Sequence, residues 1–246
     1  MKLIIFSDIH GNSYALEAFI EEIKGITYDY VVFCGDIFGY YYNQKEIITQ
    51  LAAMDRLIWL RGNHDTYFLK LFAEQNCERG REQLKYCIDH YGHCYEHLEE
   101  RYSREEEVLL AACPSKYILN TGDCKIGIFH GTPEDSLEGR LYPDKPVLNP
   151  KLYHEFDIVI LGHTHCRMKR WEKKTLVINS GSLGQPRDGN GYGYAELDTW
   201  TKEVTFHTVQ INQNLLYQQI ERFDPDLKKL KEVLERKSEK NTSDGY

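Results

Sequence analysis

Long apolar segments are missing from this sequence. None of its 246 residues belongs to an apolar run of the roughly 20 residues that cross a bilayer, so we expect no membrane span. The first apolar run covers only residues 2–6 and is followed at once by Ser7 and Asp8. A secretory signal needs a longer apolar stretch, so this run predicts a first β-strand.

Paired cysteines are missing as well. The seven cysteines are irregularly spaced, odd in number and never arranged as C-x-x-C. A disulfide framework uses an even number of cysteines in an oxidising compartment. We therefore expect reduced thiols and a cytoplasmic location.

The chain also lacks an excess of basic residues. Its 30 Lys and Arg against 38 Asp and Glu give a formal net charge of −8. General nucleic-acid binding depends on lysine and arginine that neutralise phosphates, so we do not expect it. A small phosphate-containing substrate is compatible with this charge, because bound metal ions supply positive charge locally.

What the first 62 residues do contain is an alternation of short apolar runs and amphipathic helical patterns. The runs predict strands at 2–6, 28–35 and 55–62, and the patterns predict helices at 13–24 and 44–54. Strands separated by helices of this length indicate a mainly parallel sheet with right-handed crossovers.

Beyond residue 65 the composition changes. Residues 66–112 are rich in Glu, Arg, Lys and Tyr without a strand pattern, which predicts a helical insertion. Further strands are predicted at 116–120 and 124–131, as an antiparallel pair, and at 156–162, 175–181, 191–198 and 203–211. A Pro-rich loop at 132–150, a charged helix near 213–236 and a flexible tail at 238–246 complete a single domain, 1–246.

Polar clusters follow five of the predicted strands. They contain Asp8 and His10; Asp36; Asn63, His64 and Asp65; His130; and His163 with His165. Each alone has an ordinary explanation, such as a helix cap or a surface histidine. Five clusters drawn from Asp, His and Asn are better explained by coordination, because ligands in open α/β sheets collect at the carboxyl ends of strands.

The ligand types narrow the chemistry of this site. Carboxylate, imidazole and amide oxygen without thiolate suit Mn²⁺, Fe²⁺, Zn²⁺ or Ni²⁺. Seven ligands exceed what one ion with an open position needs, but suit two ions that share a carboxylate. Two ions about 3.5–4 Å apart can clamp the attacking and leaving oxygens at phosphorus and turn a bridging water into a hydroxide nucleophile.

In their order, these motifs resemble the calcineurin-like metallophosphoesterase superfamily over residues 1 to about 200. The motifs are D-x-H (Asp8, His10), G-D (Gly35, Asp36), G-N-H-D (Gly62 to Asp65), H (His130) and G-H-x-H (Gly162 to His165). The resemblance implies a four-layer α/β/β/α sandwich with mixed sheets. Residues 179–190 are similar to a segment of small bacterial and archaeal phosphodiesterases, although Ser180 replaces their usual proline.

The resemblance also implies a role for each residue. One ion would be held by Asp8, His10, Asp36 and His165, and the second by Asp36, Asn63, His130 and His163. His64 would stabilise the developing charge and protonate the leaving oxygen, with Asp65 orienting its ring. Manganese is the expected metal, with iron, zinc and nickel as alternatives.

The expected function is hydrolysis of phosphodiester or phosphoanhydride bonds in small molecules, nucleotides among them. A symmetric dinucleoside polyphosphate hydrolase is an alternative, because residues 181–190 also resemble that group. A non-catalytic scaffold of the same fold is disfavoured, since His64 and every ligand position are present. The sequence leaves open whether the chain forms a homo-oligomer.

Three further features have weaker interpretations. Arg187 could contact phosphate, because a guanidinium fork suits phosphate geometry, and Tyr40, in a Tyr-rich loop, could stack a nucleobase. Residues 86–97 place cysteines and histidines on one helical face. A separate zinc site there is an alternative to our preferred interpretation, in which that face packs the insertion onto the body.

Overall fold

Strand β1 (Lys2–Phe6) lies in the middle of the first of two five-stranded sheets. Leu3 and Ile5 pack between the two sheets, whereas Ile4 and Phe6 pack against helices on the other face. A strand buried on both faces requires such an uninterrupted apolar run. The computed structural model describes residues 1–74, 77–122 and 124–236, and the expected tail at 238–246 lies outside them.

The first sheet has the strand order β10-β9-β1-β2-β3. Strands β1, β2 (Tyr30–Phe33) and β3 (Leu57–Trp59) are parallel, and β9 (Gly193–Asp198) and β10 (Glu203–Thr208) are antiparallel. Helices α1 (Ser13–Ile23) and α2 (Gln44–Ala52) connect the parallel strands, as predicted. Helix α1 begins where the Asn12 side chain accepts a hydrogen bond from the Ala15 N–H at 3.1 Å.

The second sheet has the order β4-β5-β6-β8-β7. Its strands are β4 (Lys116–Asn120), β5 (Lys125–Phe129), β6 (Ile158–Leu161), β7 (Arg167–Glu172) and β8 (Thr175–Ser180). The predicted antiparallel pairing of β4 with β5 is confirmed, and β5, β6 and β8 are parallel. Strand β7 was not predicted, because only Met168 of its charged sequence is buried and the apolar alternation is too weak to recognise.

The helices of the insertion begin at Asn63, three residues before the predicted start. They are α3 (Asn63–Glu74), α4 (Glu78–Tyr91), the 3₁₀ turn η1 (His93–Tyr95), α5 (Leu98–Arg101) and α6 (Arg104–Ala112). A capping box between Ser103 and Glu106 starts α6. The early start matters for the site, because it places the G-N-H-D motif on the first turn of a helix.

The last predicted helix is interrupted. Residues 213–236 were expected to form one helix, but α8 (Gln213–Phe223) and α9 (Lys228–Leu234) are separate. Pro225 explains the break, because proline cannot donate the backbone hydrogen bond and disfavours helical backbone at the preceding residue, Asp224. Because the helical periodicity continues on both sides of Pro225, the sequence pattern predicted one uninterrupted helix.

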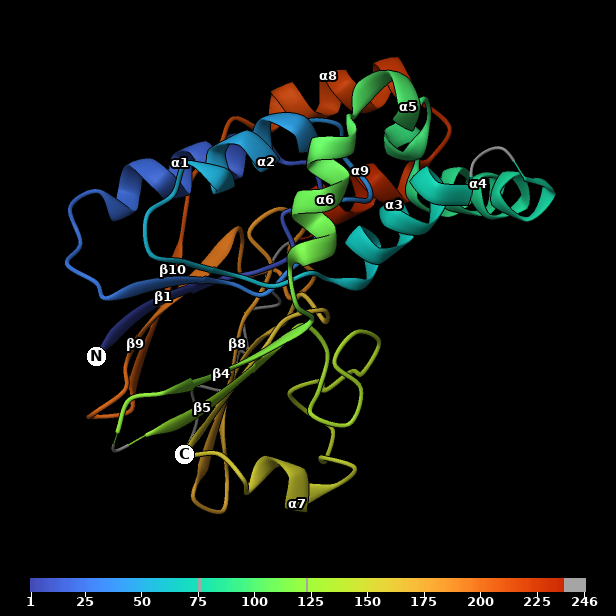
Figure 1. Cartoon of the computed structure of the whole chain (residues 1–246). Helices are drawn as coiled ribbons and strands as arrows, with labels where there is room; N and C mark the ends of the chain where they lie inside the picture. The colour runs from blue at the N-terminus through green and yellow to red at the C-terminus, as the bar shows by residue number, and fades with distance from the viewer. Residues whose placement is uncertain (75–76, 123, 237–246) are drawn as a thin grey trace.

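Figure 1 shows the layers. Helices α1, α2, α6 and α8 lie over the outer face of the first sheet, and helix α7 (Pro150–Tyr153) lies on the far side of the second. The expected four-layer α/β/β/α class with mixed sheets is confirmed. Its fourth layer consists of α7 and the irregular segment 131–149, which cover apolar side chains such as Phe129, Val159 and Val177.

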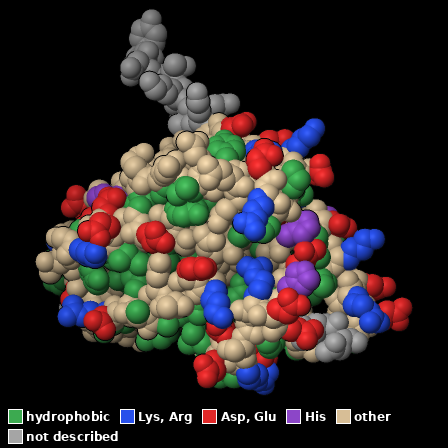
Figure 2. All heavy atoms as spheres, turned by 90° about the horizontal axis from the view of Figure 1, so that it is seen from above, with side chains coloured by type: hydrophobic (Ala, Val, Ile, Leu, Met, Phe, Trp, Pro, Cys, Tyr) green, Lys and Arg blue, Asp and Glu red, His purple; other side chains and the backbone are tan. Residues whose placement is uncertain are grey.

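Acidic and basic side chains are interspersed on the helical face, which Figure 2 shows from above. This mixture is typical of a solvated surface. Among the described residues, no helix combines the length and the apolar character that crossing a membrane requires.

The carboxylate of Asp224 joins the C-terminal helices to the rest of the helical layer. It accepts hydrogen bonds from the Tyr42 hydroxyl at 2.5 Å and from the His93 N–H at 3.1 Å, and it pairs with His93 Nδ1 at 2.5 Å. Asp224 is 5% exposed, so these bonds replace water that the carboxylate cannot reach.

We therefore expect Asp224→Ala to lower the free energy of unfolding by about 1–3 kcal/mol, since it leaves the partly buried donors of Tyr42 and His93 without their acceptor. Urea denaturation would measure this loss. The matched control is Asp226→Ala, which removes an exposed carboxylate two residues away and should have little effect. Equal losses in the two variants would contradict the linking role of Asp224.

The stability that this pair contributes should depend on pH. The hydrogen bond to Asp224 raises the pKa of His93 above its ordinary value. A raised pKa in the folded state stabilises it at pH below the ordinary histidine value, and this part is lost as pH rises through the raised value. The difference between the wild type and His93→Gln should shrink accordingly, and a difference that grows with pH would contradict the assignment.

Candidate metal centre

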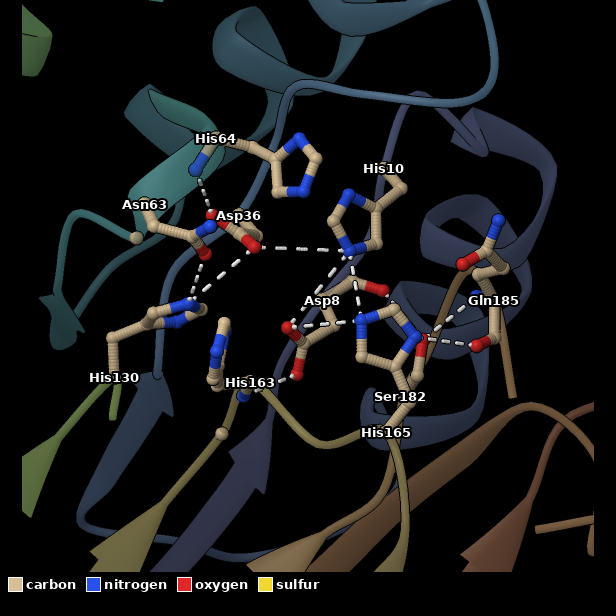
Figure 3. A network of polar contacts seen from close by, with 12 residues as sticks. Asp8, His10, Asp36, Asn63, His64, His130, His163, His165, Ser182 and Gln185 are labelled. Carbon is tan, nitrogen blue, oxygen red and sulfur yellow. Dashed lines mark hydrogen bonds and ion pairs between the residues drawn. The ribbon is translucent and has the colours of Figure 1, made fainter. Parts of the chain in front are cut away.

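Strands from both sheets end at the same place. Backbone hydrogen bonds join the segments that follow them: Asp8 N–H to Gly35 O at 2.9 Å, Gly162 N–H to His130 O at 2.9 Å and Gly184 N–H to Asp8 O at 3.0 Å. All of these segments follow parallel strands, whose carboxyl ends share one edge. The polar clusters predicted from the sequence therefore meet, and Figure 3 shows their side chains pointing toward one another.

One group of candidate ligands consists of Asp8, His10 and His165. His10 Nε2 lies 3.0 Å from His165 Nε2. Asp8 Oδ1 lies 3.9 Å from the first of these nitrogens and 3.4 Å from the second. All three residues are buried, so their polar atoms face one another rather than water.

A second group surrounds His130. Its Nε2 lies 3.4 Å from Asp36 Oδ2 and 3.0 Å from Asn63 Oδ1. The ring of His163 is 5.1 Å from the ring of His130, measured between centroids. One ligand atom each from Asp36, His130 and His163 lies within 4.8 Å of the others, which is close enough to hold one ion.

Asp36 lies between the two groups. Its Oδ2 is 3.8 Å from His10 Nε2 and 3.4 Å from His130 Nε2. Its Oδ1 accepts the His64 backbone N–H at 2.8 Å, which orients the carboxylate. A carboxylate in this position can reach ligands of both groups (Figure 3).

Backbone carbonyls hold three of the histidine rings. Nδ1 of each ring lies beside one: His10 beside Phe38 O at 2.6 Å, His130 beside Cys34 O at 2.8 Å and His165 beside Gln185 O at 2.7 Å. A carbonyl can only accept, so Nδ1 carries the hydrogen and Nε2 of a neutral ring keeps its lone pair. Nε2 is also the atom that faces the shared centre, as metal binding requires.

Burial keeps the rings of His10, His163 and His165 neutral. It lowers the pKa of His10 to about 4 and the pKa of His163 to about 3, because a buried site disfavours the charged imidazolium. Burial also lowers the pKa of His165 well below its ordinary value. Neutral imidazole is the form that binds divalent metal ions.

The carboxylates of the site need positive charge. Burial raises the pKa of Asp8 to about 7, and among the described residues Asp8 Oδ1 has no hydrogen-bond partner. Burial alone would raise the pKa of Asp36 and lower that of His130, but their mutual attraction holds Asp36 below its ordinary value and raises His130 to about 9. Buried carboxylates beside neutral imidazole nitrogens fit divalent cations, which would supply the missing charge.

Five of the seven candidate ligands have a left-handed backbone. The φ angles are +56° for Asp8, +49° for His10, +71° for Asp36, +64° for His163 and +58° for His165. Residues other than glycine rarely adopt this conformation, and it costs about 1–3 kcal/mol where it occurs. The surrounding sheets stabilise this strained backbone conformation. The conformation directs the side chains toward one centre.

Two glycines allow the backbone to approach this centre closely. A Cβ on Gly62 would lie 2.0 Å from Asp36 Oδ1, and a Cβ on Gly184 would lie 1.7 Å from Ile9 O. Only glycine fits at either position. The glycine of the G-N-H-D motif is therefore required by the position of Asp36.

The contacts of Asp65 and the partner of the His64 ring differ from the sequence-based prediction. Asp65 was expected to orient the ring of His64, but its carboxylate accepts backbone N–H groups of Gly62, Asp36, Ile37 and Phe38 at 2.7–3.2 Å. The His64 ring instead has the Tyr95 hydroxyl 2.9 Å from its Nδ1. Asp65 lies on the first helical turn with its carboxylate aimed at the loop after β2, and this prediction was wrong.

A cleft of about 110 Å³ opens over the ligands. It is lined by Asp36, Asn63, His64, His163 and His165, and by Tyr40, Tyr67, Tyr91, Arg140, Tyr142 and Arg187. The predicted Tyr40 and Arg187 are therefore at the site, whereas Tyr41 packs in an apolar cluster with Leu216. No pattern in the sequence pointed to Arg140, which lies in an irregular loop without periodicity.

The cysteines and histidines of residues 86–97 do not form a metal site among the described residues. Cys87 and Cys94 are buried in the core, and His93 pairs with Asp224. The ring of His90 stacks on Tyr86 with 4.0 Å between centroids. The preferred interpretation, that this face packs onto the body, agrees with the burial of the cysteines.

Comparisons with known proteins find relatives of this sequence and of this fold. A protein of Methanocaldococcus jannaschii described as uncharacterized is 26% identical over 236 residues, covering 89% of this chain and 91% of that protein. A hypothetical protein from Pyrococcus horikoshii has the same fold, with a TM-score of 0.76 at 20% identity, covering 95% of this chain and 97% of that one. So does a metallophosphoesterase from Sphaerobacter thermophilus, with a TM-score of 0.76 at 22% identity and coverage of 96% and 98%.

A match of this sequence to a family profile identifies the family of the chain. The profile of the calcineurin-like phosphoesterase superfamily domain matches residues 1–202, most of the chain and every candidate ligand. Within these residues the structure gathers groups of histidines and aspartates that could hold a metal ion. This chain therefore belongs to the calcineurin-like phosphoesterase superfamily and is a metal-dependent hydrolase of phosphoester bonds.

Proposed function

We propose that this chain hydrolyses phosphodiester or phosphoanhydride bonds of small molecules with the help of two divalent metal ions. The observation that supports this most strongly is the position of Asp36 between two groups of buried ligand atoms. Manganese suits these ligands, and iron, zinc or nickel would also bind them. All seven cysteines are free, which supports a reducing, cytoplasmic location.

Asp8, His10 and His165 would hold one ion, and Asn63, His130 and His163 the other. Asp36 would ligate both. When bound, the ions supply positive charge to the phosphoryl oxygens and lower the pKa of water.

His64 would act on the leaving group. Its Nδ1 can donate to the Tyr95 oxygen at 2.9 Å, while the Tyr95 hydroxyl donates to the His64 carbonyl at 3.3 Å. This pairing leaves Nε2 available to deliver a proton to the leaving oxygen. Burial lowers the pKa of His64, and an anionic phosphoryl group in the cleft would oppose that shift by favouring the imidazolium.

The insertion would shape the substrate pocket. Tyr67 of α3 and Tyr91 of α4 lie on the His64 side of the cleft, with ring centroids 5.4 Å and 4.5 Å from the His64 ring. Tyr40 adds a third aromatic face, 5.3 Å from the same ring. Aromatic faces of this kind accept nucleobases, so nucleotides are suitable substrates to test.

Asp36→Asn should remove most of the bound metal. The amide keeps the size of the side chain and can still accept the His64 N–H, but it loses the charge that both ions would share. We expect metal content, measured by elemental analysis after gel filtration, to fall from about two ions per chain to below one.

The matched control is Asp55→Asn, which changes an exposed aspartate away from the cleft. It should keep the metal content of the wild type. Retention of two ions by a folded Asp36→Asn protein, with folding checked by circular dichroism, would exclude the bridging role.

His64→Ala should keep the metal and lose rate. General acid catalysis contributes about 100- to 10,000-fold, and its loss is most severe for leaving groups that need a proton. We expect a large fall in kcat for alkyl phosphoesters and a smaller one for nitrophenyl esters. His90→Ala, an exposed histidine on α4, is the control, and equal losses for both ester types would rule out the acid role.

A further inference from the structure

Two arginines from separate loops line the cleft beside the ligands. Arg140 lies in the segment after β5, and its Nε donates to His163 Nε2 at 2.9 Å. Within the described residues its two terminal amino groups donate to no protein acceptor. A neutral imidazole has a single lone pair, so a metal ion that binds His163 would take the acceptor that Arg140 uses and free the Nε–H of Arg140.

Arg187 is held in place on the other side. One of its terminal amino groups donates to the Tyr40 hydroxyl and to Gln185 Oε1, each at 2.9 Å. Its guanidinium also lies over the Tyr40 ring, 5.6 Å from the centroid. The remaining nitrogens, Nε and the second amino group, have no acceptor in the part of the chain that the structure describes.

The charge of the cleft favours a strongly anionic ligand. Among its described lining residues, Asp36 is the one acid, and it belongs to the proposed ligand set. Glu138, which lies nearby, is engaged by the Tyr67 hydroxyl at 2.9 Å. Two guanidinium groups are therefore left to meet the substrate, in addition to whatever charge bound ions supply.

The cleft is also small. Its volume is about 110 Å³. Tyr67 and Tyr91 close one side with nearly parallel rings, 6.1 Å apart. This space suits one phosphoryl group with a single substituent that leads out of the cleft.

We propose that Arg140 and Arg187 make the site selective for a terminal phosphoryl group, as in a monoester or at the end of a polyphosphate, over an internal phosphodiester. This inference rests on the proposed function and narrows it, because it favours terminal phosphoanhydrides and monoesters over the phosphodiesters that are also named there. A terminal phosphoryl group carries up to two negative charges on three oxygens, whereas a diester carries one charge on two. The additional charged oxygen is what a free guanidinium fork binds.

The reaction that this substrate undergoes is a simple hydrolysis. The oxygen of water bonds to phosphorus, and the bond from phosphorus to the leaving oxygen breaks. The leaving oxygen takes a proton, and inorganic phosphate is the second product. The arginines bind and orient the phosphoryl group without exchanging protons, because guanidinium stays protonated.

The first test measures equilibrium binding. Manganese-loaded protein is titrated by calorimetry with inorganic phosphate and with dimethyl phosphate, a diester anion of similar size. We expect the wild type to bind phosphate more tightly. In Arg140→Ala/Arg187→Ala this preference should shrink about 10- to 100-fold, since charged hydrogen bonds are lost on one ligand more than on the other.

The second test compares turnover of nitrophenyl phosphate and bis(nitrophenyl) phosphate, which share a leaving group. In the single variants Arg140→Ala and Arg187→Ala, kcat/KM for the monoester should fall about tenfold more than for the diester. The lysine variants of both positions should recover part of the loss, since they restore charge without the fork.

Arg222→Ala is the control, because it removes an arginine of α8 that does not line the cleft. It should match the wild type, and elemental analysis should show unchanged metal content in every variant. Equal losses for monoester and diester, or an unchanged preference for phosphate, would overturn the proposal. A protein that hydrolyses neither ester but keeps the arginine-dependent preference for phosphate would instead refute only the proposed activity.

Discussion

Two buried carboxylates, Asp8 and Asp36, are the constraint on which this structure depends. Both lie where water cannot solvate them, and Asp8 Oδ1 has no partner among the described residues. Buried negative charge is costly unless a positive charge balances it. His130 balances Asp36 in part, but the imidazoles of His10, His163 and His165 are neutral. The site is therefore built for cations, and its lone pairs already face the position that cations would take.

The rest of the fold serves to hold this arrangement. Parallel strands from two sheets end at one edge, and the segments that follow them are joined by backbone hydrogen bonds. The apolar layer between the sheets supplies the stability that holds five strained, left-handed residues in place. Asp65 contributes to the same support, because it ties four backbone amides of the neighbouring loops to one carboxylate. Its role is to position the loop that carries Asp36.

The loops and the insertion add what the ligand cluster lacks. Helices α3 and α4 bring tyrosines to the ring of His64, and η1 brings Tyr95 to its Nδ1. Arg140 and Arg187 come from two different loops and leave guanidinium donors free toward the cleft. The division is a physical one. In the function that we propose, residues on short turns after strands coordinate metal, because such turns are rigid, whereas residues on the insertion and longer loops shape the space that selects the substrate.

Much of the centre could be predicted from the sequence. Strand β1 is recognisable from its apolar run, and the seven candidate ligands lie in five short motifs at strand ends, because a strand delivers its carboxyl-terminal residues to a known edge of a sheet. The break at Pro225 and the weakly patterned β7 were missed where local patterns were ambiguous. The partner of His64, the contacts of Asp65 and the presence of Arg140 were decided only by the tertiary structure. Except for the contact between Asp65 and Gly62, these contacts join residues more than 20 positions apart, and local periodicity carries no information about which distant side chain will fill a given space.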